Sequence, residues 1–144
     1  MKTHWLKIFI IPLLILMLNA CSSLTPPIEL APNGEIVKKA IALQLKQTET
    51  ALSESLMASS PQFDLNQIKV KNIDPLFIAH LATYHLQGTY NLKLKLPRQK
   101  VTQQSNPFDI YLQRQVEGKT WRLLRRDLHD DDAQPQWTSY LIEP

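Results

Sequence analysis

A strict alternation of apolar and polar side chains between Tyr84 and Leu96 constrains the fold of this chain more than any other feature. The apolar side chains share one parity, namely Tyr84, Leu86, Tyr90, Leu92, Leu94 and Leu96, whereas the polar ones are His85, Gln87, Thr89, Asn91, Lys93 and Lys95. Successive side chains of a strand point to opposite faces, so the pattern predicts one long β-strand with a buried face and a solvent face. Parallel strands are usually apolar on both faces, which favours an antiparallel sheet. Gly88 lies inside this strand and predicts a bulge or bend.

A helical period precedes this strand. Apolar or weakly polar residues recur every three or four positions, namely Val37, Ile41, Leu45, Thr48, Leu52 and Leu56, with Ile36, Ala40 and Ala51 beside them. Asn33 is a suitable N-cap, and Pro61 ends the segment. We expect a helix of more than 20 residues whose apolar side covers the sheet. The alternative, an amphipathic membrane or partner helix, is less favoured because the basic residues do not line one edge.

Shorter alternating segments predict the other strands. Ile68 and Val70 alternate with lysines and indicate a short strand that stops before the Asp74-Pro75 break. Three segments follow the long strand and predict a hairpin and a final edge strand: residues 108–113, a turn at 117–119 with a strand at 120–126, and residues 137–142. The expected order is one helix, then four or five antiparallel strands in a meander.

This order defines an α+β layer in which one long N-terminal helix packs on a curved antiparallel sheet. Together with the strand start Gly118-Lys119-Thr120-Trp121-Arg122-Leu123, it resembles the cystatin-like and NTF2-like folds over residues 34–144. The resemblance implies a helix lying in the concavity of a bent sheet. It fixes no function, because such folds host enzymes, ligand pockets and assembly modules. The catalytic carboxylate or histidine of NTF2-like enzymes maps to no residue of this chain.

The first 21 residues have the plan of a signal peptide. Lys2 and Lys7 precede an apolar run of eleven residues, Ile8 to Leu18, which is too short to span a bilayer. Leu18-Asn19-Ala20-Cys21 resembles the lipobox of bacterial lipoproteins, with Asn19 departing from the usual residue. The resemblance implies that a signal peptidase recognises Leu18 and Ala20 and that Cys21 is lipidated. An uncleaved membrane anchor is the alternative interpretation.

These signals divide the chain into three parts. Residues 1–20 are the expected signal peptide, 21–33 a lipidated tether containing Pro26, Pro27 and Pro32, and 34–144 a single α+β domain. A proline-rich tether of a dozen residues reaches about 37 Å, so the domain is expected to stand off the membrane. In the alternative, the segment packs along the domain through Leu24, Ile28 and Leu30.

Charge and cysteine content narrow the function. The formal net charge of +3 includes Lys2 and Lys7, so it falls to +1 once residues 1–20 are removed, and a nucleic-acid partner is not expected. Cys21 is the only cysteine. The domain therefore has no disulfide, and no thiol is left for catalysis.

Few residues of the sequence are candidates for catalysis or metal binding. His80 and His85 are poorly spaced for a shared metal ion, and the Asp-rich run 127–132 lacks the spacing of a calcium loop. No catalytic residue, metal or cofactor is predicted. Four residues are expected to form a basic patch on the solvent face, with Tyr111 nearby: Lys93, Lys95, Arg122 and Arg126. The patch would contact anionic lipid, an acidic partner or a cell-wall polymer, or it would serve solubility alone.

The preferred hypothesis is an exported lipoprotein, anchored by Cys21 to a bacterial membrane on its periplasmic or outer-membrane side. Its non-catalytic domain would bind or help assemble another envelope component. One alternative is a module that holds an apolar or amphipathic ligand between helix and sheet. Another is an NTF2-like enzyme, for which His80 is the only candidate catalytic residue.

Overall fold

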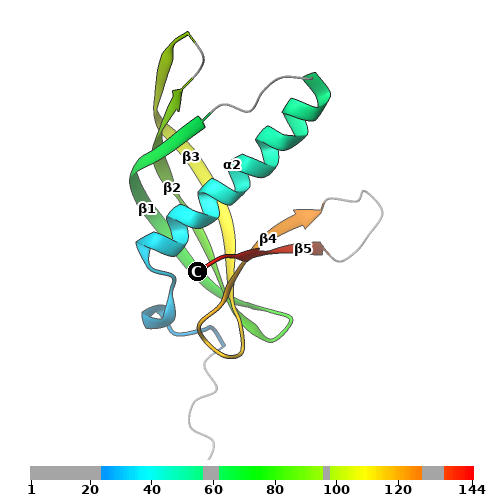
Figure 1. Cartoon of the computed structure of the whole chain (residues 1–144). Coiled ribbons are helices and arrows are strands. Elements are labelled where there is room, and N and C mark those ends of the chain that lie inside the picture. The colour runs from blue at the N-terminus through cyan, green and yellow to red at the C-terminus, as the bar shows by residue number, and fades with distance from the viewer. Residues whose placement is uncertain (1–23, 57–61, 96–97, 128–134) are drawn as a thin grey trace, which may run out of the picture.

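The computed structural model describes residues 24–56, 62–95, 98–127 and 135–144. In this part of the chain one α-helix packs on an open antiparallel sheet of five strands, which confirms the α+β class (Figure 1). The elements in chain order are η2 (Ile28–Leu30), α2 (Gly34–Leu56), β1 (Gln62–Ile78), β2 (Leu81–Lys95), β3 (Lys100–Arg114), β4 (Trp121–Asp127) and β5 (Gln136–Ile142). The strands lie in the order β1-β2-β3-β4-β5, so the predicted meander is confirmed.

The alternation along β2 is confirmed by the burial of its side chains. Tyr84 and Leu86 are fully buried, and Tyr90 and Leu92 are nearly so. From His85 to Lys95 the polar side chains on the other parity are half-buried or exposed, whereas Thr83 at the start of the strand is buried. Leu96 lies outside the described residues. The buried parity defines the inner face of the sheet, which α2 crosses in Figure 1, and the other parity defines the outer face.

Helix α2 begins where the sequence places its cap. The side-chain oxygen Oδ1 of Asn33 accepts a hydrogen bond of 3.0 Å from the backbone N–H of Ile36, which satisfies one otherwise unpaired donor of the first turn. Val37, Ala40 and Ile41 are buried against the sheet. Thr48, expected on the buried stripe, is exposed. The side chains of residues 51–56 and the predicted stop at 58–61 lie outside the described part.

Strand β1 is longer than predicted, because it continues through the Asp74-Pro75 pair to Ile78. Proline lacks a backbone donor, but β1 is an edge strand paired only with β2, so one of its sides needs no such donor. The pairing of β1 with β2 shifts register twice, between Asn66 and Lys69 and between Val70 and Asn72.

Gly88 explains where these irregularities fall. A side chain there would place its Cβ 2.1 Å from the backbone oxygen of Lys69 and 2.7 Å from the ring of Phe108. The predicted bulge therefore lies in β1, opposite Gly88, rather than in β2 itself. The glycine is required because β1 and an inner-face ring both approach its backbone closely.

The predicted hairpin between β3 and β4 is confirmed. Gly118 adopts a φ of 75°, a conformation that glycine reaches without strain, and its N–H donates to the carbonyl of Gln115. Pairing between the two strands extends only from Arg114–Trp121 to Tyr111–Leu124. Beyond Leu124, β4 pairs only with β5, so the two hairpins diverge and leave a fork between β3 and β4 (Figure 1).

The described part of the expected tether is fastened to the domain. The hydroxyl of Tyr84 donates a hydrogen bond of 2.7 Å to the carbonyl oxygen of Pro27, and Pro26 is buried. Leu24, Ile28 and Leu30 remain 95%, 48% and 42% exposed. The segment thus packs on the domain through its prolines rather than through the three aliphatic residues proposed in the alternative interpretation.

Candidate functional site

Several predicted site residues lie outside the described part of the chain. These are Leu18, Ala20 and Cys21 of the lipobox, and the acidic residues after Asp127, for which no metal site was predicted, also lie outside it. Asp127 itself accepts a hydrogen bond from the hydroxyl of Thr138, and its Oδ1 lies 3.5 Å from the Nε of Arg125. This aspartate is therefore engaged within the β4–β5 hairpin.

The structure divides the four residues of the basic patch into two groups. All four are on the outer face. Arg122 pairs with Gln113, and Gln113 pairs with Thr83, which lies ten residues before Lys93 on β2. At about 3.3 Å per strand residue, this separates Arg122 and Lys93 by roughly 33 Å. Lys93 and Lys95 lie instead near Lys100, which is paired with Lys95 at the far end of the sheet.

The far end carries an open groove of about 510 Å³. Lys93, Lys95 and Lys100 line it together with partly buried apolar side chains, Phe63, Leu94 and Val101. We call this end, with its three lysines, the lysine tip. It is open, and its residues include no histidine or cysteine.

His80 and His85 are not brought together. His80 occupies the tight β1–β2 turn with a φ of 62°, and its side chain is exposed. His85 lies on the outer face of β2, within a row formed by Asp74, His85 and Tyr111 on adjacent strands. In the described ranges, no three histidine, cysteine or acidic side chains are grouped so as to hold a metal ion.

The outer face around His85 is the most organised polar site of the domain. Nε2 of His85 lies 2.7 Å from Oδ1 of Asp109, and Nδ1 lies 3.9 Å from Oδ2 of Asp74. Gln87 donates a hydrogen bond of 2.8 Å to the second oxygen of Asp109. An ionised carboxylate only accepts hydrogen bonds, so Nε2 of His85 carries a proton and donates it to Asp109 in this arrangement.

Aromatic rings extend the site across the fork. The rings of His85 and Tyr111 stack with centroids 4.2 Å apart and an interplanar angle of 4°. Trp137 of β5 meets Tyr111 edge-on at 4.9 Å, although their strands are not neighbours. Leu124, between these strands on the same face, is only 5% exposed. We call Trp137, Tyr111, His85, Asp109 and Gln87 the outer-face cluster.

Electrostatics favour the ionised form of Asp109. Burial by itself raises the pKa of Asp109, but the hydrogen bonds from Gln87 and His85 and the charge of His85 lower it more, so the net pKa lies below the ordinary 3.8. The carboxylate is 58% exposed and the His85 side chain 18%. The pair therefore forms a fixed, charged edge on a largely accessible surface.

The outer-face cluster has the composition of a binding surface. Its polar groups point along an open sheet face that α2 does not cover, and Arg122 and Arg126 lie on the same face beside it. The guanidinium of Arg122 donates to Oγ and to the carbonyl oxygen of Ser139, at 3.0 and 3.3 Å, and is thereby held in place. Tryptophan, tyrosine and arginine are the residues most enriched at the energetic centres of protein interfaces.

The centre of the inner face is filled by its own side chains, whereas towards the fork Gln44 and Gln47 of α2 line a small hollow of about 210 Å³ together with Ile110 and Leu123. Val37, Ala40 and Ile41 of α2 are at most 1% exposed, and so are Tyr84, Leu86 and Ile110 beneath them. Burial of Tyr84 raises the pKa of its phenol, with Glu29 adding to the effect and Arg114 opposing it. The centre of the helix–sheet interface is therefore packed core rather than a chamber.

Comparisons with known proteins add no assignment. No protein-family model, no curated protein and no solved structure matches this chain. Among the residues that the structure describes, no helix has the length and apolarity needed to cross a membrane.

Sequence reasoning placed each member of the β2 and β3 part of the cluster on the solvent face but did not join them. His85 and Tyr111 meet because β2 and β3 pair in this register, and the ring of Trp137 contacts that of Tyr111 although β4 lies between their strands. The sequence feature that could have indicated the cluster is the parity of its members along β2 and β3, which puts four residues on one face: His85, Gln87, Asp109 and Tyr111.

Proposed function

We propose that this chain is an exported lipoprotein, anchored to a bacterial membrane through Cys21, whose α+β domain binds another envelope protein through the outer-face cluster. The anchor rests on the Leu18-Asn19-Ala20-Cys21 motif and the signal-peptide plan before it. Two or three acyl chains on one cysteine suffice for stable anchoring, because one chain alone binds only marginally.

The observation that carries the binding role is the row of contacting rings on an open sheet face, in which His85 stacks on Tyr111 and Trp137 meets Tyr111 edge-on. Rings held by mutual contact lose little conformational freedom on binding, which leaves more of the contact energy for the partner. The charged edge at Asp109 and the fixed guanidinium of Arg122 add directional contacts on the same face. Such groups mainly set specificity and association rate.

The lysine tip provides a second place for a charged partner. Its separation from Arg122 means that an anionic polymer or acidic protein would contact one group or the other, unless it extends along the whole strand. We keep Lys93 and Lys95 as candidates for such a contact, and Arg122 and Arg126 as part of the surface around the outer-face cluster.

The proposal also concerns the fold. One helix on one face of an antiparallel sheet supports a relationship to the cystatin-like or NTF2-like folds. The ligand-binding alternative has less support, because packed side chains occupy the centre of the helix–sheet interface. The enzymatic alternative also has less support, since His80 lies exposed in a turn, away from the acidic groups around His85.

The proposal is tested by photo-crosslinking in intact cells. A photoreactive residue replaces the exposed Arg126, next to Trp137 on the outer face, and in a matched control it replaces Thr48, which is exposed on α2. We expect a discrete crosslinked species from position 126 but not from position 48. The same species should disappear in the Tyr111→Ala, Trp137→Ala double variant and weaken in Cys21→Ala.

Two results would contradict the proposal. Equal crosslinking from positions 126 and 48 would remove the outer-face cluster as the binding surface. The absence of acyl groups on Cys21, measured by mass spectrometry of the intact protein, would remove the anchor.

A further inference from the structure

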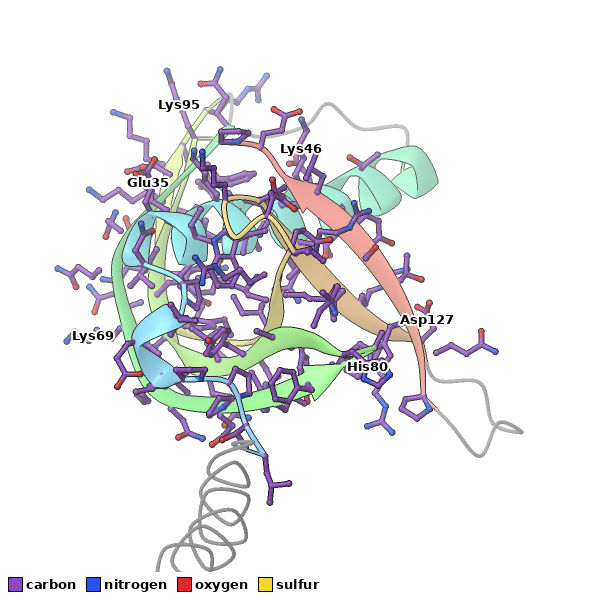
Figure 2. The ribbon with its side chains drawn as sticks, turned by 90° about the horizontal axis from the view of Figure 1, so that it is seen from below. Glu35, Lys46, Lys69, His80, Lys95 and Asp127 are labelled. Carbon is purple, nitrogen blue, oxygen red and sulfur yellow. The ribbon has the colours of Figure 1, made fainter. Side chains whose placement is uncertain are left out.

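Exposed apolar side chains gather at one end of the sheet. The β1–β2 turn joins Ile78 to Leu81, and the β3–β4 turn joins Arg114 to Trp121. The strand register puts both turns at the same end, because Thr83 is paired with Gln113. We call this the basal end, and it lies at the bottom of Figure 1 and faces the viewer in Figure 2, where His80 marks the β1–β2 turn.

The basal end exposes apolar side chains to solvent. Val116 in the β3–β4 turn is 89% exposed, and Phe77 at the end of β1 is 48% exposed. Leu24, the first described residue, is 95% exposed. Val116 occupies a turn, where polar residues are usual, and nothing in the fold requires an apolar group there.

The N-terminal segment is fastened at the same end. Tyr84, which binds the Pro27 carbonyl, is the fourth residue of β2 and therefore lies next to the β1–β2 turn. Between Cys21 and the buried Pro26 the chain advances by five residues, which span at most about 18 Å when fully extended. This is half the reach expected for a free tether of a dozen residues.

The charge at the basal end is mixed. Lys119 and Glu117 oppose each other in sign within the β3–β4 turn, and both are exposed. The cluster of three lysines lies instead at the lysine tip, about 14 residues away along β2, which corresponds to roughly 45 Å. Attraction to anionic headgroups would therefore pull on the wrong end of the domain, and a contact at the basal end must be mainly apolar.

We propose that the basal end is a membrane-contact surface, at which Leu24, Phe77 and Val116 enter the headgroup region of the bilayer. This rests on the proposed lipidation of Cys21, because the short connection then holds these side chains against the lipid. The contact fixes the orientation of the domain. The strands point away from the membrane, the lysine tip is the most distant part, and the outer-face cluster stands to one side, open to a partner.

The test uses the full, processed protein reconstituted into phosphatidylcholine vesicles. An environment-sensitive fluorophore is attached to the new thiol of Val116→Cys and, as a matched control, of Lys100→Cys at the lysine tip. We expect a blue shift and quenching by lipids brominated near the headgroup for the label at 116, since interfacial surfaces enter about 5–10 Å. The label at 100 should show neither effect. Adding phosphatidylglycerol should leave both results unchanged.

Three results would overturn the inference, and they are distinguishable. Equal emission from both labels, with acylated Cys21 and full co-flotation with vesicles, would mean that the anchor is correct and the basal contact absent. Protection of the label at 116 from aqueous quencher without quenching by brominated lipid would mean that protein, not lipid, covers this end. Two labelled thiols per chain and no co-flotation would mean that Cys21 is unmodified, which removes the anchor and the inference together.

A second variant tests the apolar character of the contact. A Val116→Asp variant labelled at Phe77→Cys should lose the blue shift while keeping co-flotation.

Discussion

The hydroxyl of Tyr84 donates a hydrogen bond to the carbonyl oxygen of Pro27, 57 residues earlier in the chain. The ring of Tyr84 is fully buried and packs at 6.0 Å from that of Trp121, so one side chain joins the core, the β3–β4 turn region and the N-terminal segment. The start of the described chain is thereby tied to the basal end of the sheet.

Tyr84→Phe removes this tie while keeping the ring. Because the Pro27 carbonyl loses its donor, we expect the free energy of unfolding to fall by about 1 kcal/mol. Urea denaturation measures this change, and limited proteolysis should cut earlier near Leu24. Tyr140→Phe is the control, since it also removes a hydroxyl but keeps the ring that contacts the guanidinium of Arg125 at 5.6 Å. An equal loss in both variants would show that the hydrogen bond to Pro27 contributes nothing specific.

Gly88→Ala should be strongly destabilising. The new methyl group would overlap the Lys69 carbonyl and the Phe108 ring, so β1 must move away from β2. We expect a loss of about 1–3 kcal/mol, the usual cost of overpacking, or more. Gly34→Ala is the matched control, because no atom lies within 4 Å of its added carbon, and stability should stay equal or rise by up to about 0.5 kcal/mol. Thermal unfolding of both variants decides the prediction, which fails if Gly88→Ala melts like the wild type.

Asn33→Ala should lower stability by about 1 kcal/mol, because the Ile36 N–H at the start of α2 loses its acceptor. Asn33→Asp keeps an oxygen in the same place, and its negative charge suits the helix N-terminus. Chemical denaturation should therefore rank Asn33→Asp at or above the wild type and Asn33→Ala below it. The reverse order would show that the cap is not used.

The contribution of Asp109 should depend on pH in a defined direction. Its pKa in the folded protein lies below 3.8 because of Gln87 and His85, so the unfolded chain binds the proton more readily. The stabilisation is thus complete above the ordinary aspartate pKa and is lost as pH falls below about 4 through the lower folded pKa. Asp109→Asn should be less stable than the wild type at neutral pH, and the difference should shrink in acid.

Urea denaturation at a series of pH values from neutral to acid checks this prediction. Asp64→Asn, at an exposed position on β1, provides the control for the loss of one negative charge. A difference between wild type and Asp109→Asn that stays constant across the series would contradict the role assigned to the hydrogen bonds of Asp109.

The sequence predicted the elements whose signals are local. The alternation around Leu86, the cap at Asn33 and the turn at Gly118 each depend on neighbouring residues, and each is present in the structure. The length of β1 was missed because Pro75 normally ends a strand, and only its place at an edge permits it. The first half of β3, which is almost entirely polar, gave no apolar period to read.

The candidate site needed long-range information. Parity placed the lysines and arginines of the predicted patch on one face, but parity says nothing about distance along a strand, and β2 is 15 residues long. His85, Asp109 and Tyr111 meet through the register in which β2 pairs with β3. Trp137 joins them across the intervening strand β4, a contact that no local pattern encodes.

The two register shifts in β1 have a consequence for the protein in concentrated solution. Along its free side, a straight edge strand of 17 residues would offer a continuous ladder of backbone donors and acceptors to the same strand of another molecule. In β1 the shifts interrupt that ladder near its middle, Lys69 and Lys71 repel an identical neighbour, and Pro75 withholds a donor further along. The irregular pairing that Gly88 accommodates therefore also protects the longest free edge of the sheet from self-association into fibrils.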